Sequence, residues 1–273
     1  MQTLHFGDIT IDALSDGYLD LTIEGFFPDA PAETWKRYPE SVVGDKLRCA
    51  LTTYLIRTGG RAVLVDTGLG PRIGRWDGVA GQLPGSLKTA GIRPEQVDVV
   101  IATHLHADHV GWNCTEVSEG QYQPTFPNAQ YIVDRREWEY WDATGARYLD
   151  RTIRPLFETN QLNLVEDGYE PASGITLLST PGHTAGHISV LVFAGGEGAV
   201  VTGDAAHHPI EIEHPDWSPG MDQDRELSAH SRTVLVDRVE AEGLTLLGGH
   251  FPAPHAGRVV RVEHRRVYQP LTA

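Results

Sequence analysis

Alternating and continuous apolar runs along the chain predict a fold rich in strands, with helices between some of them. Alternation begins near the first residue, and Gly59-Gly60 between two β-rich runs predicts a hairpin. Residues 97–103 are almost continuously apolar, as in a strand that is buried on both faces. The strands expected on these grounds are 4–6, 9–14, 49–57, 61–66, 97–103, 130–134, 175–179, 188–193, 199–203, 244–249 and 258–263.

Apolar residues at helical spacing predict helices over 83–90, 135–141, 147–157 and 222–242. The last segment has acidic residues near its start, as the first turn of a helix prefers. Strand-rich, mixed and again strand-rich segments follow one another, which indicates an α/β fold of two packed sheets with outer helices. We expect residues 1–273 to form one domain, because a chain with 40% hydrophobic residues can bury one large core.

Residues 20–48 interrupt this regular pattern. They contain Phe26, Phe27, Trp35 and Tyr38 among prolines and charges, without a clean period. The pattern predicts an extended, irregular N-terminal loop. A loop with so many aromatic residues serves either as a lid over a site or as a contact in a homodimer.

Charge and composition limit the partners. The formal net charge of −15 disfavours a nucleic-acid groove or binding to an anionic membrane surface. Cys49 and Cys114 are too few for a disulfide framework. The first residues have neither a basic start nor an apolar run, and no segment is long enough to cross a bilayer. We therefore expect a cytoplasmic protein without nucleic-acid or membrane partners.

The strongest chemical signal follows the most apolar strand. Three imidazoles and one carboxylate fall within six residues there: His104, His106, Asp108 and His109. A turn at a strand end can direct alternate side chains into one pocket. Imidazole nitrogen and carboxylate oxygen are ligands that Zn²⁺, Mn²⁺ and Fe²⁺ accept. The segment therefore predicts a metal site at one edge of a sheet.

Three more strands end in a candidate ligand beside a glycine, where the backbone can turn sharply. These ligands are His183, Asp204 and His250. Taken singly, each is weak, because a lone His or Asp after a strand is more often a turn or surface residue. Four strand ends that each offer a ligand predict one shared site.

The pattern H-x-H-x-D-H, followed by separated His, Asp and His, resembles the metallo-β-lactamase superfamily. The resemblance covers nearly the whole chain, from residues 64–68 to His250. It implies a four-layer αββα sandwich and two divalent metal ions, most typically Zn²⁺, with Mn²⁺, Fe²⁺ and Co²⁺ as alternatives. It also implies that His104, His106 and His183 hold one ion, that Asp108, His109 and His250 hold the other, and that Asp204 bridges them.

Residues outside this ligand set are expected to support it. Val65-Asp66-Thr67-Gly68 matches another signature of the superfamily, which implies that Asp66 is a buried carboxylate that orients the ligands. His187 is expected to support the loop of His183 by a hydrogen bond. His208 alternates to the side opposite His207, and we expect it to be structural.

Within the superfamily, the complete dinuclear set argues against true β-lactamases. Residues 106–113 and 203–208 resemble the lactonase branch, which includes acyl-homoserine lactonases, pyridoxolactonase and methyl parathion hydrolase. Acyl-homoserine lactonases typically carry Tyr three residues after the bridging Asp, but this chain has His207. That departure favours the methyl parathion hydrolase-like side of the branch.

This resemblance implies a metal-dependent hydrolase that opens lactones or cleaves hydrophobic esters, with phosphotriester cleavage as a side activity. Metal-bound hydroxide would attack the substrate, and Asp108 would pass a proton to the leaving oxygen. His207 either contacts the substrate or supports the site. A small neutral, hydrophobic ester or lactone is expected, because the predicted pocket is aromatic with few cations. Its predicted walls are Phe26, Phe27, Trp112, Trp217 and Phe251.

Two other functions stay open. A glyoxalase II-like thioesterase is disfavoured, because residues 258–268 have a strand pattern in place of a basic C-terminal helix. An iron-dependent oxidoreductase could use the same ligands, and metal analysis would separate it. A binding protein with a vestigial site is disfavoured because no ligand is lost.

Overall fold

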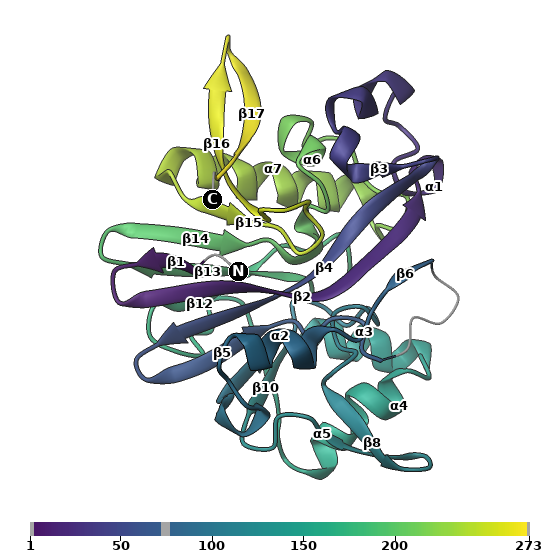
Figure 1. Ribbon diagram of the computed structural model, residues 1–273, viewed down its shortest axis with the longest axis vertical. Coiled ribbons are helices and arrows are strands. Elements are labelled where there is room, and N and C mark those ends of the chain that lie inside the picture. The colour runs from purple at the N-terminus through teal and green to yellow at the C-terminus, as the bar shows by residue number, and fades with distance from the viewer. Residues whose placement is uncertain (1–2, 72–76, 272–273) are drawn as a thin grey trace.

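The computed structural model describes residues 3–71 and 77–271. Two β-sheets pack face to face, and helices cover their outer sides (Figure 1). The predicted four-layer αββα sandwich is therefore confirmed. Within the described residues, no helix is long and apolar enough to span a membrane.

The first sheet is mixed. Its order is β1-β2-β4-β5-β7-β10-β11, with β3 paired to β4 and β6 paired to β2. Strands β5, β7, β10 and β11 run parallel, while β1, β2, β4 and β5 form an antiparallel meander. The strands are β1 (Thr3–Phe6), β2 (Ile9–Thr22), β3 (Val42–Val43), β4 (Lys46–Thr58), β5 (Arg61–Val65), β6 (Asp77–Val79), β7 (Val99–Ile101), β10 (Gln130–Asp134) and β11 (Leu162–Val165).

The second sheet runs β12-β13-β14-β15-β16-β17 and is antiparallel except for the pair β14 and β15. Its strands are β12 (Ile175–Ser179), β13 (Ile188–Ala194), β14 (Glu197–Val201), β15 (Thr245–Leu247), β16 (Ala256–Val262) and β17 (Arg265–Pro270). A small separate hairpin joins β8 (Cys114–Ser118) and β9 (Gln121–Pro124).

The helices lie outside the sheets or at their edges. They are α1 (Ile23–Phe26), α2 (Leu83–Thr89), α3 (Arg135–Thr144), α4 (Leu149–Thr152), α5 (Arg154–Glu158), α6 (Ile210–Glu213) and α7 (Arg225–Glu242). Short 3₁₀ turns occur at η1 (Ala32–Arg37), η2 (Pro39–Ser41), η3 (Pro94–Gln96) and η4 (Gly203–Ala205).

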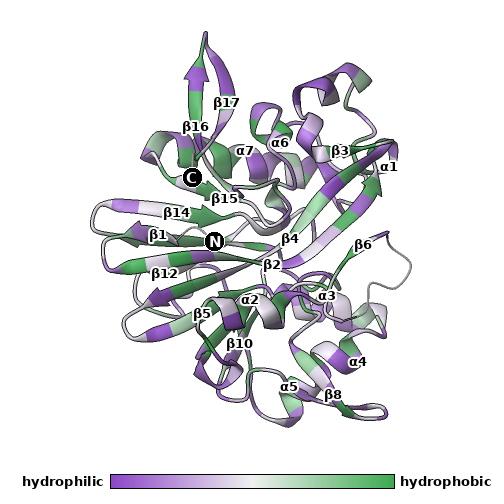
Figure 2. Ribbon diagram, in the orientation of Figure 1, coloured by the Kyte–Doolittle hydropathy of each residue, from purple (hydrophilic) through white to green (hydrophobic). Residues whose placement is uncertain are grey.

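Side-chain alternation along the strands creates the layers. On β5, Val63 and Val65 enter the core between the sheets, while Leu64 packs outward against the cluster that contains Leu87 of α2. Strand β14 behaves in the same way, since Val200 packs outward toward α7. Figure 2 shows that the strands carry most of the strongly hydrophobic positions and that the loops are largely polar. Both faces of each sheet are thus covered.

The segment 20–48 differs from its prediction. Strands β2 and β4 pair in antiparallel fashion from Thr10↔Arg57 to Thr22↔Lys46, with one register shift between Ser15 and Gly17, so both ends of the segment are strand. The middle folds into α1, η1 and η2 around a cluster of its own aromatic residues. The predicted loop is therefore shorter than 20–48, and its middle is ordered by aromatic packing that has no simple period in the sequence.

Candidate metal centre

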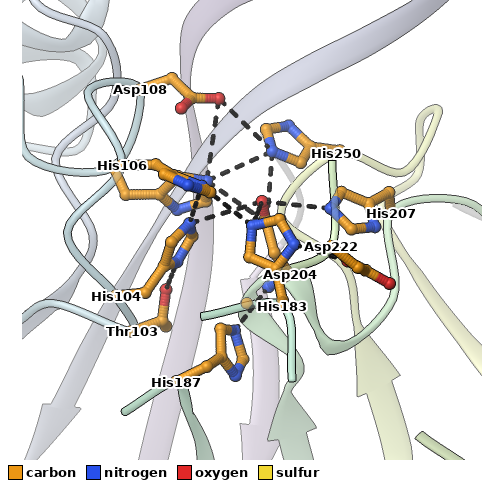
Figure 3. Close-up of polar contacts among 12 residues, drawn as sticks. Thr103, His104, His106, Asp108, His183, His187, Asp204, His207, Asp222 and His250 are labelled. Atoms are coloured by element: carbon orange, nitrogen blue, oxygen red, sulfur yellow. Dashed lines mark hydrogen bonds and ion pairs between the residues drawn. The ribbon is translucent and has the colours of Figure 1, made fainter. Parts of the chain in front are cut away.

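Loops from both sheets meet at one edge of the sandwich (Figure 3). The loop after β7 carries four of the predicted ligands, while the loops after β12, β14 and β15 carry one each. Two clusters capable of holding a metal ion include all seven: His104, His106, His183 and Asp204 in one, Asp108, His109 and His250 in the other.

In the first cluster, three ring nitrogens converge. Nδ1 of His106 lies 2.9 Å from Nε2 of His104 and 2.9 Å from Nε2 of His183. The rings of His104 and His183 are fully buried. Three imidazole nitrogens that point at one another away from water are best satisfied by a cation among them.

The second cluster lies beside the first. Nε2 of His109 is 3.2 Å from Nε2 of His250. One oxygen of Asp108 lies 3.8 Å from His109 and 3.6 Å from His250. Asp108 is the most exposed of these three side chains, so its carboxylate borders the pocket described below.

Asp204 stands between the clusters and offers one oxygen to each. Its Oδ1 lies 3.3 Å from His109 and 3.2 Å from His250. Its Oδ2 lies 3.6 Å from His104 and 3.3 Å from His183. A carboxylate with one oxygen toward each set of imidazoles has the geometry of a bridging ligand.

This donor set fits divalent metal ions. Oδ1 of Asp204 is buried and has no hydrogen-bond partner, which is costly unless a cation binds there. Imidazole nitrogens with carboxylates suit Zn²⁺ and its neighbours in the first transition row. The described residues can hold an ion in each cluster.

Comparison with known proteins agrees with this geometry. The family model of the metallo-β-lactamase superfamily matches residues 48–255. The chain belongs to the metallo-β-lactamase superfamily. A relative from Bacillus sp., named an N-acyl homoserine lactonase, is 32% identical over 224 residues, covering 76% of this chain and 83% of the relative. The lactonase AttM of Azorhizobium caulinodans is 31% identical, covering 73% and 78%. This superfamily member is a metal-dependent hydrolase.

Solved structures share the fold. The hydrolase AbOPH superposes with a TM-score of 0.86 at 24% identity, covering 99% of this chain and 97% of that one. The dizinc quorum-quenching lactonase AidC gives 0.83 at 21% identity, covering 100% and 97%. At such identities the likeness establishes the fold of this superfamily member.

Both predicted support residues lie against the ligands of this metallo-β-lactamase fold. Asp66 is buried, and its Oδ2 lies 2.8 Å from Nδ1 of His109. Nε2 of His187 accepts a hydrogen bond of 2.9 Å from the backbone N–H of Asp204. Gly203 precedes Asp204 and has φ +52°, and a Cβ there would lie 2.7 Å from the His187 ring. This turn therefore requires glycine.

Further partners of the ligands were missed by the sequence analysis. Asp222 lies 2.8 Å from Nδ1 of His183, and the carbonyl of Ala50 lies 2.6 Å from Nδ1 of His250. Such partners fix the tautomer and orientation of a ligating ring. Nothing near Asp222 in the sequence marks it, because it is 39 residues from its partner and belongs to no motif.

The charges of the site act in opposite directions on its histidines. Burial, followed by repulsion from neighbouring imidazoles, lowers the pKa of His104 and lowers that of His106 to about 3. At His109 and His207, burial also opposes the charge, but Asp204 and other carboxylates outweigh it. The pKa of His207 rises to about 10. The negative carboxylates that retain these protons would attract a divalent cation in the same way.

A cavity of about 310 Å³ opens beside the two clusters. Neither Lys nor Arg is among its lining residues in the described part of the chain. The lining consists of Leu19, Leu21, Phe26, Cys49, His106, Ala107, Asp108, Trp141, Tyr148, Asp204, His207, Met221 and His250.

Phe26 is the predicted wall residue that lines this cavity, and the other four lie elsewhere. Phe27 packs against Trp35 in the aromatic cluster of segment 23–45, and Trp217 stacks on His214. Their assignment to the wall is corrected, because Phe27 is buried in this cluster, Trp217 packs against the same cluster from the chain after α6, and neither lines the cavity.

Trp112 and Phe251 are corrected as well. The indole N–H of Trp112 donates to the buried carboxylate of Asp16 at 2.9 Å, which directs the ring toward other surface hollows. Phe251 is fully buried and packs against Tyr268 in the outer core of the second sheet. Adjacency to a ligand in sequence does not fix the side on which a ring lies.

Proposed function

We propose that this hydrolase uses two divalent ions, most typically zinc, to open small hydrophobic lactones or cleave related esters. The arrangement of Asp204 carries this proposal, because each of its oxygens faces a separate set of ligands. The curated relatives named N-acyl homoserine lactonases support a lactone as the substrate class.

Ions bound here would lower the pKa of a shared water and polarise the substrate oxygen. The protein's own groups do the rest. Asp108 borders the cavity, where its carboxylate can pass a proton to the leaving oxygen of the opened ring. His207 also lines the cavity, where its Nε2 lies 3.3 Å from Oδ2 of Asp204. With Asp204 engaged by metal ions, this nitrogen can bond a substrate oxygen.

The cavity favours a neutral substrate with an apolar chain. Leu19, Leu21, Phe26 and Met221 give it an aliphatic and aromatic wall. The polar ends of two further lining residues point away, because Trp141 donates to Glu137 and the Tyr148 hydroxyl donates to the carbonyl of Leu105. Because neither Lys nor Arg is among the described residues that line the cavity, an anionic substrate would find counter-charge only at the metal ions and at His207, whose pKa is raised.

The segment 23–45 is proposed as a cap over this cavity. Its Phe26 lies edge-on to the ring of His207, with centroids 5.2 Å apart. The cluster of the segment therefore sets one wall of the site. We also propose a cytoplasmic protein that acts as a homodimer, which size measurement in solution tests.

The decisive experiment is a screen on zinc-loaded protein with lactones, aryl esters, thioesters and phosphotriesters. We expect lactones and esters to give the highest kcat/KM and phosphotriesters to give a weak side activity. A strong preference for thioesters would favour the glyoxalase II-like alternative. Iron in the purified protein, together with redox turnover, would favour the oxidoreductase.

Replacement of the bridging ligand gives the matching test of the site. Asp204→Asn removes the charge between the two clusters, so we expect loss of at least one zinc ion per chain. Activity should fall by more than the roughly 10–100-fold that loss of a ligand's outer partner costs. The control is Asp224→Asn, which weakens the N-terminal cap of α7 but touches no ligand. Retained activity in Asp204→Asn would contradict the two-ion proposal.

A further inference from the structure

Arg232 is a fully buried cation in the middle of helix α7. It lies on the inner face of that helix with Leu235, Val236 and Val239, where an apolar side chain would be expected. A buried arginine is expensive unless its donors are all used.

The guanidinium uses its donors to hold the loop that leaves the metal centre. Nε donates to the carbonyl of Ala205 at 2.6 Å, and Nη1 donates to the carbonyls of Pro215 and Trp217. These carbonyls span the segment between the bridging Asp204 and the next turn. Arg232 therefore fixes the course of the chain on both sides of His207.

Nη2 faces two buried carboxylates, each of which also contacts a histidine of the site. It lies 3.4 Å from Asp222 and 3.2 Å from Glu211. The other oxygen of Asp222 lies 2.8 Å from Nδ1 of His183. Glu211 accepts a hydrogen bond of 2.6 Å from the backbone N–H of His207 and lies 3.5 Å from its ring.

Asp222 and Arg232 form one path to a single set of ligands. Figure 3 shows Asp222 beside His183, in the set that includes His104 and His106. The second set takes its support from other groups, namely Asp66 at His109 and the Ala50 carbonyl at His250. A change at Arg232 should thus act mainly on the first set of ligands, because it reaches the second set only through the loop of Asp204 and His207, which its bond to the Ala205 carbonyl helps to hold.

The alternative explanation of the buried Arg232 is that its ion pairs with Asp222 and Glu211 only stabilise the fold. Such pairs would stabilise α7 against the loop and would affect both sets of ligands only through unfolding. The two explanations differ in their effect on the two ions, which makes them separable by metal binding.

We propose that Arg232 is a positioning residue that fixes Asp222 against His183 and Glu211 against His207. Through Asp222, it controls the affinity for the ion held by His104, His106 and His183 more strongly than the affinity for the other ion. This inference rests on the two-ion site proposed above.

The test is a zinc titration of the metal-free full chain against a competing chromophoric chelator. Arg232→Lys keeps the charge but replaces the planar fork of donors with a single ammonium. We expect about tenfold weaker binding of one zinc ion, at the low end of the effect of outer partners, and a distinctly smaller change in the binding of the other. Circular dichroism confirms the fold. The control is Arg238→Lys on the same helix, whose exposed side chain pairs with Glu242, and it should bind both ions as the wild type does.

Double variants identify which of the two zinc ions is bound more weakly in Arg232→Lys. Asp222→Asn removes the negative charge that faces both His183 and Arg232, so Arg232→Lys combined with it should bind zinc as Asp222→Asn alone does. Asp66→Asn removes the negative charge beside His109, so its combination with Arg232→Lys should weaken the binding of both zinc ions. If substitution at Arg232 prevents folding, the Asp222→Asn variant still tests the proposal. The proposal requires this variant to lose affinity for one zinc ion selectively.

The proposal is overturned if Arg232→Lys lowers the affinity for both zinc ions equally or for neither. It is also overturned if the loss of affinity in Arg232→Lys adds fully to the loss in Asp222→Asn. A wild-type chain that binds one zinc ion overturns the two-ion site instead, and the first titration reveals this before any variant is made. The Arg232 proposal then stands only if Arg232→Lys and Asp222→Asn each lower the affinity for that one ion, and if the double variant loses no more affinity than Asp222→Asn alone.

Discussion

His207 lies between a bridging carboxylate and a buried glutamate. Its Nε2 is 3.3 Å from Oδ2 of Asp204, and its ring stacks on that of His250 with centroids 5.8 Å apart. A phenyl ring can keep these packing contacts but cannot bond a substrate oxygen. Replacing His207 by Phe therefore separates its role in bonding the substrate from its role in packing.

We expect His207→Phe to keep two zinc ions and to lower kcat by about 100-fold, the lower range for a group that assists proton transfer or bonds the reacting oxygen. Steady-state kinetics on the best lactone, with metal analysis of the same sample, measures this. The control His214→Phe preserves the stacked ring beside Trp217, away from the ligands, and should leave kcat unchanged. Unchanged kcat in His207→Phe would assign the residue to packing.

Proton competition makes zinc binding dependent on pH. Burial opposes the charge on His109 and His250, yet Asp204 and neighbouring carboxylates raise the pKa of both rings. A zinc ion must displace these protons, so its apparent affinity should rise as pH rises and fall as pH falls. Chelator competition at a series of pH values checks the sign. Affinity that is constant or falls with rising pH would show that these rings are not ligands.

At the scale of elements, the segment 23–45 depends on its own aromatic cluster. Trp35 is 5% exposed and packs against Phe27 and the edge-on ring of His208. Trp35→Ala should lower the free energy of unfolding by about 3–5 kcal/mol, as for other buried aromatic truncations.

Chemical denaturation measures this effect. The control Phe193→Ala, at a side chain that is 47% exposed, should cost far less. Because Phe26 belongs to the same cluster and lines the cavity, Trp35→Ala should also raise KM for lactones. If Trp35→Ala lowers the free energy of unfolding as expected but leaves KM unchanged, the role of this segment as a cap is contradicted.

Element prediction succeeded where the periodicity was local. The apolar run before His104 is strand β7, and the long helical pattern near the C-terminus is α7. The predicted helix over 147–157 is instead split into α4 and α5, because Pro155 lies in the first turn of α5 and cannot continue the hydrogen bonds of α4. Strands β3, β6, β8, β9 and β11 were missed, because they are short and become strands through their pairing partners, whereas β17 begins within the strand pattern expected over 258–268.

Across the whole molecule, the metal ions would join the two halves of the sandwich. The first sheet supplies His104, His106, Asp108 and His109, and the second sheet supplies His183, Asp204 and His250. Ligands from both sheets meet fully only in the folded chain, so metal binding should stabilise the fold.

Removing zinc with EDTA should therefore lower Tm. An ion present at about 100 times its Kd contributes about 2.7 kcal/mol, which corresponds to a shift of roughly 5–10 °C in a chain of this size. Thermal denaturation followed by circular dichroism, before and after chelation and after zinc is restored, tests this. An unchanged Tm after proven loss of metal would show that the ions do not link the sheets.

The sequence by itself determined the kind of protein and the ligand types. The dense run from His104 to His109 after an apolar strand, and the ligands beside glycine at three later strand ends, required only local pattern. The tertiary structure decided which group each oxygen of Asp204 faces, which aromatic rings line the cavity, and that Asp222 lies between Arg232 and His183. These depend on contacts between residues far apart in the chain, because side-chain direction and burial are fixed only when the two sheets and α7 pack together.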